Sequence, residues 1–200
     1  MLNRRHLLAA PVALAAAPLA RPALAQAWPA RTVRIIVPWP PAGSTDVLVR
    51  FYAERLQAML GQSVVVENRP GAGGNIGVDA VTKSAPDGYT IGIASVGHLS
   101  INEFLYARLA YDPHALKLVG VAWELPNAAV VPAEHNPSRA LQDFIAWAKA
   151  KPDGITYGSP GVGTTPHLSG ALFCARVGIQ GPHVPVRGAA QAIPLLLWGQ

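Results

Sequence analysis

Three short segments of the sequence combine glycine with serine or threonine, and these residue types favour the binding of an anion. The segments are Pro41–Asp46, Ser95–His98 and Ser159–Thr165. Hydroxyl groups donate hydrogen bonds, and the first N–H groups of a helix bind negative charge at the positive end of the helix dipole. We therefore predict a small-carboxylate site that needs no buried lysine or arginine.

Each segment follows an expected strand and opens onto the start of a helix. In an open α/β sheet the ligand crevice lies beyond the carboxyl ends of the strands, so we expect the three segments to meet there. The residues predicted to bind the ligand are Pro41, Ala42, Gly43, Ser44, Thr45, Asp46, Ser95, Gly97, His98, Ser159, Gly163, Thr164, Thr165 and His167.

Motifs for cofactors and metals are incomplete. From Gly71 the chain approaches the dinucleotide pattern G-x-G-x-x-G, but Ile76 occupies the third glycine position. The segment Gly158–Thr165 approaches a phosphate-binding loop, yet Thr164 stands where that motif needs lysine. The six histidines show no paired spacing, and Cys174, the single cysteine, is expected to be a buried hydrophobe. We expect neither a cofactor nor a metal.

A serine hydrolase is the enzymatic alternative. Ser95 lies in Ile93–Gly97, which resembles a nucleophile elbow except that isoleucine replaces its first glycine. His98 is three residues away, whereas a triad partner normally comes from elsewhere in the fold. We expect a binding protein and not an enzyme, and an exported hydrolase that uses Ser95 stays open as a second reading.

Alternating strands and helices predict the first half of the fold. Short β-branched runs that end at proline or glycine indicate strands, and apolar residues at helical spacing indicate helices. Val64–Val66 is apolar throughout, which predicts a strand buried on both faces. Ser44, Thr45 and Asp46 offer N-caps to the first helix, and Gly61 ends it. The expected strands are Val33–Val37, Val64–Val66 and Tyr89–Ala94, and the expected helices are 44–60 and 75–85.

The second half repeats this order of elements. Ala128–Val131 is expected to be a connecting strand just after the boundary at Pro126. A helix over 138–150, a strand over 155–157 and a helix over 166–177 follow it. The order indicates an α/β fold with parallel sheets flanked by helices, divided into lobes over 26–125 and 126–200.

The first 25 residues are typical of a secretory signal peptide. Arg4 and Arg5 precede an apolar stretch over 7–20, and Ala23-Leu24-Ala25 forms a small-residue cleavage site, so the mature chain is expected to begin near Gln26. Secretory and twin-arginine export both fit this start. Without the three arginines of this segment, the net charge of +5 falls to +2, and no basic run remains to bind nucleic acid.

Several segments together resemble the tripartite tricarboxylate transporter receptors, also called the Bug family. The most specific are Glu67-Asn68-Arg69-Pro70-Gly71-Ala72-Gly73-Gly74 and Pro86-Asp87-Gly88-Tyr89-Thr90. Ile36 to Gly43 with Asp46, Tyr157-Gly158-Ser159 with His167-Leu168, and His183-Val184-Pro185 add to the likeness, which extends over 28–200.

The resemblance implies a two-lobed, type II periplasmic-binding-protein-like fold that closes on a di- or monocarboxylate, or sometimes on an aromatic acid or amide. It implies delivery of that ligand to the permease subunits of a membrane transporter, a periplasmic location and a monomeric receptor. By matching position, Pro41–Asp46 would hold the ligand carboxylate, and Ser159 with Gly163, Thr164 and Thr165 would face it from the other lobe. The sequence does not name the ligand.

The sequence departs from the family pattern at several positions. Ser44 replaces a usual glycine, Val186-Arg187 replaces a Tyr-Lys pair, and Leu195 and Trp198 replace an acidic residue and a glycine. Relatives continue well beyond Gln200, so the second lobe is expected to be incomplete. A truncated, non-functional receptor fragment is therefore the third reading.

Overall fold

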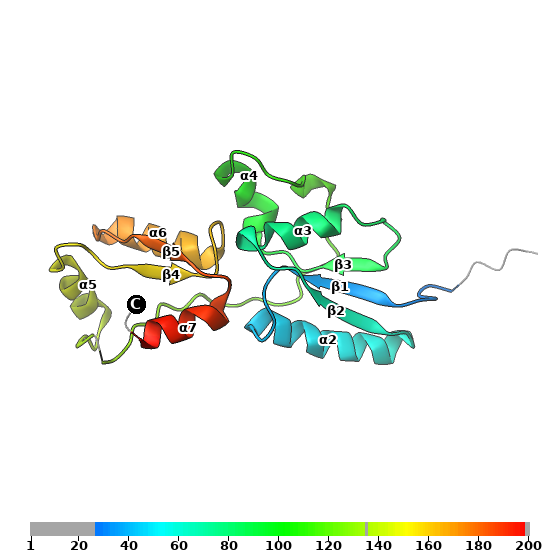
Figure 1. Cartoon of the computed structure of the whole chain (residues 1–200), viewed down its shortest axis with the longest axis horizontal. Helices are drawn as coiled ribbons and strands as arrows, with labels where there is room; N and C mark the ends of the chain where they lie inside the picture. Colours follow the sequence, from blue (N-terminus) through cyan, green and yellow to red (C-terminus); the bar gives the residue numbers. More distant parts are fainter. Residues whose placement is uncertain (1–26, 135, 199–200) are drawn as a thin grey trace, which may run out of the picture. The chain divides into compact units, whose positions relative to one another are not determined.

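The first sheet has its most apolar strand at the centre. In the computed structural model, which describes residues 27–134 and 136–198, β1 (Val33–Val37) pairs in parallel with β2 (Val64–Asn68) on one side and β3 (Thr90–Gly92) on the other. The predicted signal peptide over 1–25 lies outside the described residues. The parallel arrangement predicted from the alternation of strands and helices is confirmed (Figure 1).

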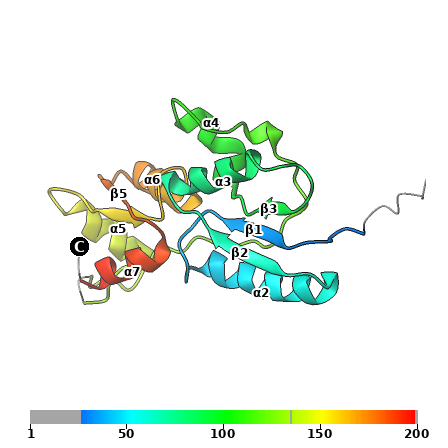
Figure 2. The ribbon, with the colours of Figure 1, turned by 45° about the vertical axis from the view of Figure 1, so that its right-hand side comes forward.

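Two helices cover the two faces of this sheet. Helix α2 (Ser44–Leu60) packs on β1 and β2, and α3 (Asn75–Thr82), which follows the short 3₁₀ turn η1 (Ala72–Gly74), packs on β1 and β3. Figures 1 and 2 show the helices on opposite sides of the strands. The core lies on the α2 side, where Ile35 and Val37 pack against Val49 and Ala53. Burial of each such aliphatic side chain stabilises the folded state by about 1.5–3 kcal/mol.

The start of α2 differs from the prediction, and its end agrees with it. Gly43 is the N-cap and no side chain caps the helix, so the capping role predicted for Ser44, Thr45 and Asp46 is wrong. The Asp46 carboxylate accepts instead from the N–H of Ala42, outside the helix. Gly61 ends the helix at a φ of 64°, which an L side chain adopts only with strain.

The prediction that Val64–Val66 is buried on both faces is wrong. β2 is one of the two edge strands of this sheet, and the side chain of Val65 is 50% exposed. The fully covered strand is β1, whose residues Val33, Ile35, Ile36 and Val37 are at most 3% exposed. An apolar run shows that a strand is favoured, but it does not show where that strand lies in the sheet.

A long connection joins the first sheet to the second. It contains the π-helical turn η2 (Gly97–Ile101), the short helix α4 (Asn102–Leu105) and the 3₁₀ turn η3 (Pro113–Ala115). Residues 116–131 have no regular secondary structure, so the strand predicted at Ala128–Val131 is absent. These apolar residues are largely exposed, and Val130 is 66% exposed.

The second sheet repeats the parallel pattern on a smaller scale. β4 (Tyr157–Ser159) pairs with β5 (His183–Pro185) across helix α6 (Thr165–Val177). The strand predicted at 155–157 therefore begins two residues later than expected. Helices α6 and α7 (Ala189–Leu197) pack on β4, and α5 (Leu141–Lys149) precedes it. Cys174 on α6 is buried, as expected.

Candidate binding pocket

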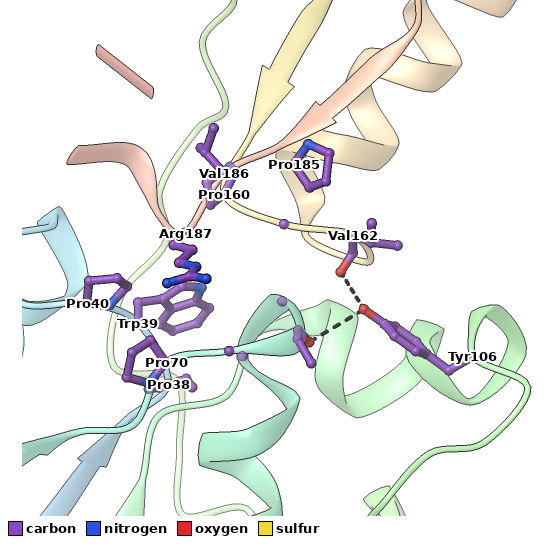
Figure 3. A pocket seen from close by; sticks show the side chains of 15 residues that line it. Pro38, Trp39, Pro40, Pro70, Tyr106, Pro160, Val162, Pro185, Val186 and Arg187 are labelled. Atoms are coloured by element: carbon purple, nitrogen blue, oxygen red, sulfur yellow. Dashed lines mark hydrogen bonds between the residues drawn. The ribbon is translucent and has the colours of Figure 1, made fainter. Parts of the chain in front are cut away.

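A pocket of about 640 Å³ is bordered by the segments that lead into four helices. These segments come from both sheets: two precede α2 and α3, and two precede α6 and α7. Figure 3 shows Tyr106 on one side of the pocket and Trp39 on the other. The lining residues are Pro38, Trp39, Pro40, Pro70, Gly71, Ala72, Gly73, Gly74, Tyr106, Pro160, Gly161, Val162, Pro185, Val186 and Arg187.

The segment before α2 is held by Asp46, whose buried carboxylate is fully occupied by donors of the chain. Its Oδ2 accepts from the N–H of Ala42 and from Nε of Arg50, both at 3.0 Å. Its Oδ1 accepts from Nδ2 of Asn68 at 2.8 Å, and the same amide also donates to the carbonyl of Trp39. The hydrogen bond from Arg50 is the main cause that lowers the pKa of Asp46 to about 2. Asp46 therefore fixes the pocket wall through the loop, and its charge is neutralised locally.

The segment before α3 touches the segment before α6 backbone to backbone. Gly73 has a φ of 66°, and a side chain there would collide with the carbonyl oxygen of Val162. Gly161, on the opposite segment, approaches Gly73 in the same way, since a Cβ there would lie 2.8 Å from the Cα of Gly73. Tyr106 joins the two segments, because its hydroxyl donates to the carbonyl of Val162 at 2.9 Å. Only glycine allows this approach.

His98 lies beneath the pocket and connects two of its walls. Its Nδ1 accepts from the N–H of Ser95 at 3.0 Å, so the proton of the neutral ring is on Nε2, which donates to the carbonyl of Gly73 at 3.0 Å. The ring also contacts Trp39, with centroids 5.5 Å apart. Burial lowers the pKa of His98, and the Gly73 hydrogen bond acts in the opposite direction. We infer a neutral imidazole that positions both Gly73 and Trp39.

Buried hydroxyls shape the segment before α6. Ser159 Oγ lies 2.7 Å from Nε2 of His183 and accepts from the N–H of Gly161 at 3.2 Å. Thr164 Oγ1 donates to the carbonyl of Gly161 at 2.7 Å. Both hydroxyls are turned to the loop itself, so they hold Gly161 at the pocket and are not free to meet a ligand.

His167 adds a second contact within the same loop. Its Nδ1 lies 3.3 Å from the N–H of Gly163, and its ring lies 4.1 Å from the ring of His183. Burial lowers the pKa of His183, and the nearby His167 acts in the same direction. The pair supports the loop from the side of β5.

The predicted site residues flank the pocket and do not line it. Gly97 and Gly163 bring two of the three segments into contact, because a side chain at Gly97 would collide with the carbonyl of Gly163. The third segment, Pro41–Asp46, continues directly from the lining residue Pro40. The predicted residues that lie beside the lining are Pro41, Ala42, Gly43, Ser44, Thr45, Asp46, Ser95, Gly97, His98, Ser159, Gly163, Thr164, Thr165 and His167.

Sequence reasoning missed the side chains that give the pocket its surface. Trp39 and Tyr106 are aromatic, and Arg187 is the single side chain of the lining that carries a permanent charge. The available signal for Trp39 and Arg187 was their position just after the ends of strands, and Tyr106, which follows α4, had no such signal. Gly71–Gly74 was rejected as a nucleotide motif, yet the same glycines line this pocket.

The described residues provide neither a cluster of metal-ligating side chains nor a helix that could span a membrane. No group of three or more metal-ligating side chains of the His, Cys, Asp and Glu types occurs among residues 27–134 and 136–198. None of the helices in those residues combines the length and the apolar character that crossing a membrane requires.

Comparison with known proteins identifies a family. The family model described as tripartite tricarboxylate transporter family receptor matches residues 48–200. Protein BugT of Bordetella pertussis is 39% identical over 195 residues, which cover 93% of this chain and 57% of BugT. The chain spans about half to three fifths of the lengths of the curated relatives it matches.

Solved structures show the same fold. The R. palustris protein Rpa4515, solved with adipate, is 32% identical with a TM-score of 0.73, and the match covers 86% of this chain and 57% of that one. MatC from Rhodopseudomonas palustris, solved with bound malate, is 27% identical with a TM-score of 0.75 over 86% of this chain and 59% of its own. The resemblance and the α/β fold class stated from the sequence are confirmed.

Proposed function

We propose that this chain, which belongs to the tripartite tricarboxylate transporter receptor family, captures a small carboxylate in the pocket between its two sheets. Two solved relatives hold adipate and malate. The binding lobes over 26–125 and 126–200 are part of this proposal, as is a monomeric receptor.

The observation that carries the proposal is the meeting of four helix-leading segments around one pocket. The segments supply backbone N–H groups near the positive ends of helix dipoles, where a carboxylate is stabilised. Among the described residues, the N–H groups of Gly71 and Val162 donate to no acceptor of the chain. Both residues line the pocket, so donors remain for a ligand.

The interactions available are strong enough for useful affinity. A micromolar ligand requires about 8 kcal/mol of net binding free energy. A charge-assisted hydrogen bond contributes roughly 1.5–3 kcal/mol, and a helix terminus adds up to about 2 kcal/mol. Three or four donors, together with apolar contact on Trp39 and the prolines, reach that range.

A thermal-shift series tests the proposal. We expect the melting temperature of the chain to rise with the concentration of malate, succinate or adipate, because a ligand that binds only the folded state stabilises it by about 2.7 kcal/mol at 100 times Kd. The neutral diamides of the same acids serve as controls of matched shape. A cooperative melt that no small carboxylate shifts contradicts the proposal, and a broad melt without any shift supports the non-functional fragment.

Export and delivery complete the proposed role. A chain with a cleavable signal peptide ending near Ala25 would act in the periplasm and pass its ligand to the permease subunits of a transporter. The family match supports this role, and the solved relatives include a periplasmic transporter protein.

The proposed receptor does not catalyse a reaction. The matching family and the solved relatives are binding proteins. Ser95 Oγ lies 3.1 Å from Nδ1 of His98, but Nε2 of that ring faces the carbonyl of Gly73 and no carboxylate. A hydrolytic histidine is normally oriented by a carboxylate partner. Turnover of a small ester that is lost in Ser95→Ala would contradict this assignment.

A further inference from the structure

We propose that Tyr106 is a latch between the two lobes: its hydroxyl holds the loop before α6 against the first lobe and thereby sets how long a bound ligand stays in the pocket. The joining of the lobes can be measured without a ligand, whereas the effect on release rests on the proposed function. Tyr106 is a positioning residue in this scheme, because it acts on the ligand through the loop that it holds.

Tyr106 ends α4 in the first lobe and reaches the second lobe. Its N–H donates to the carbonyl of Asn102 at 3.0 Å, and its hydroxyl donates to the carbonyl of Val162 at 2.9 Å (Figure 3). The hydroxyl has a single proton, and the carbonyl oxygen of Ala72 lies farther away at 3.5 Å. Among residues 27–134 and 136–198, the bond to Val162 is the only hydrogen bond between the two lobes, and no ion pair joins them.

Contacts through glycine surround this hydrogen bond. A Cβ on Gly73 would lie against the carbonyl oxygen of Val162, and one on Gly97 would lie against the carbonyl oxygen of Gly163. Within the described part of the chain, neither glycine donates its N–H to the carbonyl that it approaches. These are van der Waals contacts, which are individually weak and not directional. The Tyr106 hydroxyl therefore provides the directional interaction that holds the two lobes together.

Asn102 opposes the latch. It is 1% exposed, and its Nδ2 donates to Oδ1 of Asn75 at 2.7 Å. Its own Oδ1 is buried and accepts from no donor of residues 27–134 and 136–198. A Cβ on Gly163 would collide with this oxygen, so the oxygen faces the second lobe. A buried acceptor without a donor destabilises the joined arrangement, and separation of the lobes would let water reach it.

The Tyr106 hydroxyl and the Asn102 side-chain oxygen thus act in opposite directions on the equilibrium between joined and separated lobes. The free energies of one hydrogen bond and of one unpaired buried acceptor are of similar size. Removal of the hydroxyl alone is therefore expected to shift the population towards separated lobes.

The latch also fixes a donor for the ligand. The peptide group between Val162 and Gly163 is held at both ends, since its carbonyl accepts from Tyr106 and its N–H lies 3.3 Å from Nδ1 of His167. Val162 lines the pocket, and its own N–H, one peptide group earlier, donates to no acceptor of the described residues. Release of the loop moves that donor away from the ligand, so we expect the effect mainly in the dissociation rate.

Tyr106→Phe tests the latch, because it removes the hydroxyl and keeps the ring. Small-angle scattering measures the radius of gyration of the ligand-free chain, and stopped-flow tryptophan fluorescence measures the release of adipate, since Trp39 lines the pocket. We expect Tyr106→Phe to increase the radius of gyration of the ligand-free chain. We expect it to raise the dissociation rate of adipate about fivefold, as for the loss of one neutral hydrogen bond, and to change the association rate little.

Tyr52→Phe is the matched control. The Tyr52 hydroxyl also donates to a backbone carbonyl at 2.9 Å, that of Ala122, but both residues belong to the first lobe. We expect Tyr52→Phe to leave both the radius of gyration and the dissociation rate unchanged.

The inference is wrong if Tyr106→Phe matches the intact chain in radius of gyration, or if Tyr52→Phe raises the dissociation rate to the same extent. Either change without the other also contradicts it. Faster release alone would indicate direct contact between the hydroxyl and the ligand, and a larger radius alone would show that joining of the lobes does not govern release. If the intact chain binds neither adipate nor malate, the proposed function fails, and the scattering comparison alone decides whether Tyr106 joins the lobes.

Discussion

Both carboxylate oxygens of Asp46 are engaged by donors of the chain itself, at a position predicted to bind the ligand. Ala42, Arg50 and Asn68 supply those donors. Asp46 therefore acts indirectly, by orienting the Asn68 amide that donates to the backbone carbonyl of Trp39. A carboxylate beside a glycine loop is visible in a sequence, but the partners that occupy it are not.

The lowered pKa of Asp46 predicts how its contribution depends on pH. A carboxyl group whose pKa falls from 3.8 to about 2 on folding stabilises the fold above pH 3.8 and loses that contribution as the pH falls through 2. The shift corresponds to about 2 kcal/mol at neutral pH. We expect Asp46→Asn to lower the free energy of unfolding by about this amount at pH 7, measured by urea denaturation.

The difference between Asp46→Asn and the unaltered chain should shrink as the pH is lowered from 4 towards 2. Glu54→Gln is the control, because Glu54 is an exposed acid on the same helix that forms no ion pair with any side chain of residues 27–134 and 136–198. A deficit for Asp46→Asn that is the same at pH 7 and near pH 2 would show that the charge is not the cause.

The lining side chains were not predictable from the sequence, for a reason specific to each. Tyr106 follows a helix that periodicity did not indicate, and its hydroxyl reaches Val162, 56 residues later. Arg187 lies in a segment that was noted only for its departure from a family pattern. In both cases the position in the pocket lining depends on the tertiary arrangement of segments that are far apart in the sequence. Local residue patterns contain no information on that arrangement.

At the scale of elements, the predictions from the sequence were most accurate where a local residue pattern alone determines the structure. Gly61 ends α2, and the β-branched run Val33–Val37 forms β1. The predictions were wrong where the outcome depends on neighbouring strands. β2 is an edge strand, and the apolar run at Ala128–Val131 forms no strand. Composition favours an extended chain, but a strand forms only when a partner offers its hydrogen bonds.

The contact between the two glycine segments predicts a strong effect of one methyl group. Gly73→Ala places Cβ against the carbonyl of Val162 and near the hydroxyl of Tyr106 in a left-handed backbone conformation. We expect the free energy of unfolding to fall by roughly 2–4 kcal/mol, from backbone strain and overpacking together. Chemical denaturation monitored by circular dichroism measures the change.

Gly61→Ala separates the two causes. Gly61 has a φ of 64°, close to that of Gly73, but nothing lies within 4 Å of a Cβ placed there. Gly61→Ala should lower the free energy of unfolding only by the backbone strain, about 1–2 kcal/mol. Equal losses for the two variants would mean that the segment moves aside and that the close backbone contact has little energetic weight.

At the scale of the whole molecule, the two sheets are joined by a connection whose last part has no regular secondary structure. Residues 116–131 lack regular structure, and Val119 and Val121 are 93% and 82% exposed. Trp123 stacks on Tyr52 of the first lobe, and Asn127 donates to Ser169 of the second. We propose that the hinge lies near Pro126, between these two contacts, where no helix or strand has to break. The glycine segments and Tyr106 form the opposing contact across the pocket.

Closure about this hinge is measurable in solution. We expect small-angle scattering to show a smaller radius of gyration with saturating adipate than without ligand, and no change with the neutral diamide. Binding that is detected by calorimetry without compaction would contradict hinge closure while leaving the carboxylate site intact.

The makeup of the pocket lining also determines how the molecule responds to acid. Tyr106 keeps its proton and Arg187 keeps its charge across the range in which histidines titrate, and the lining holds no other ionisable group. No side chain of the lining therefore changes its charge in this pH range. The titratable groups next to the lining are His98, which contacts the carbonyl of Gly73, and His183, which contacts Ser159. Under the proposed function, the lining therefore keeps its positive charge for an anionic ligand in mildly acidic surroundings.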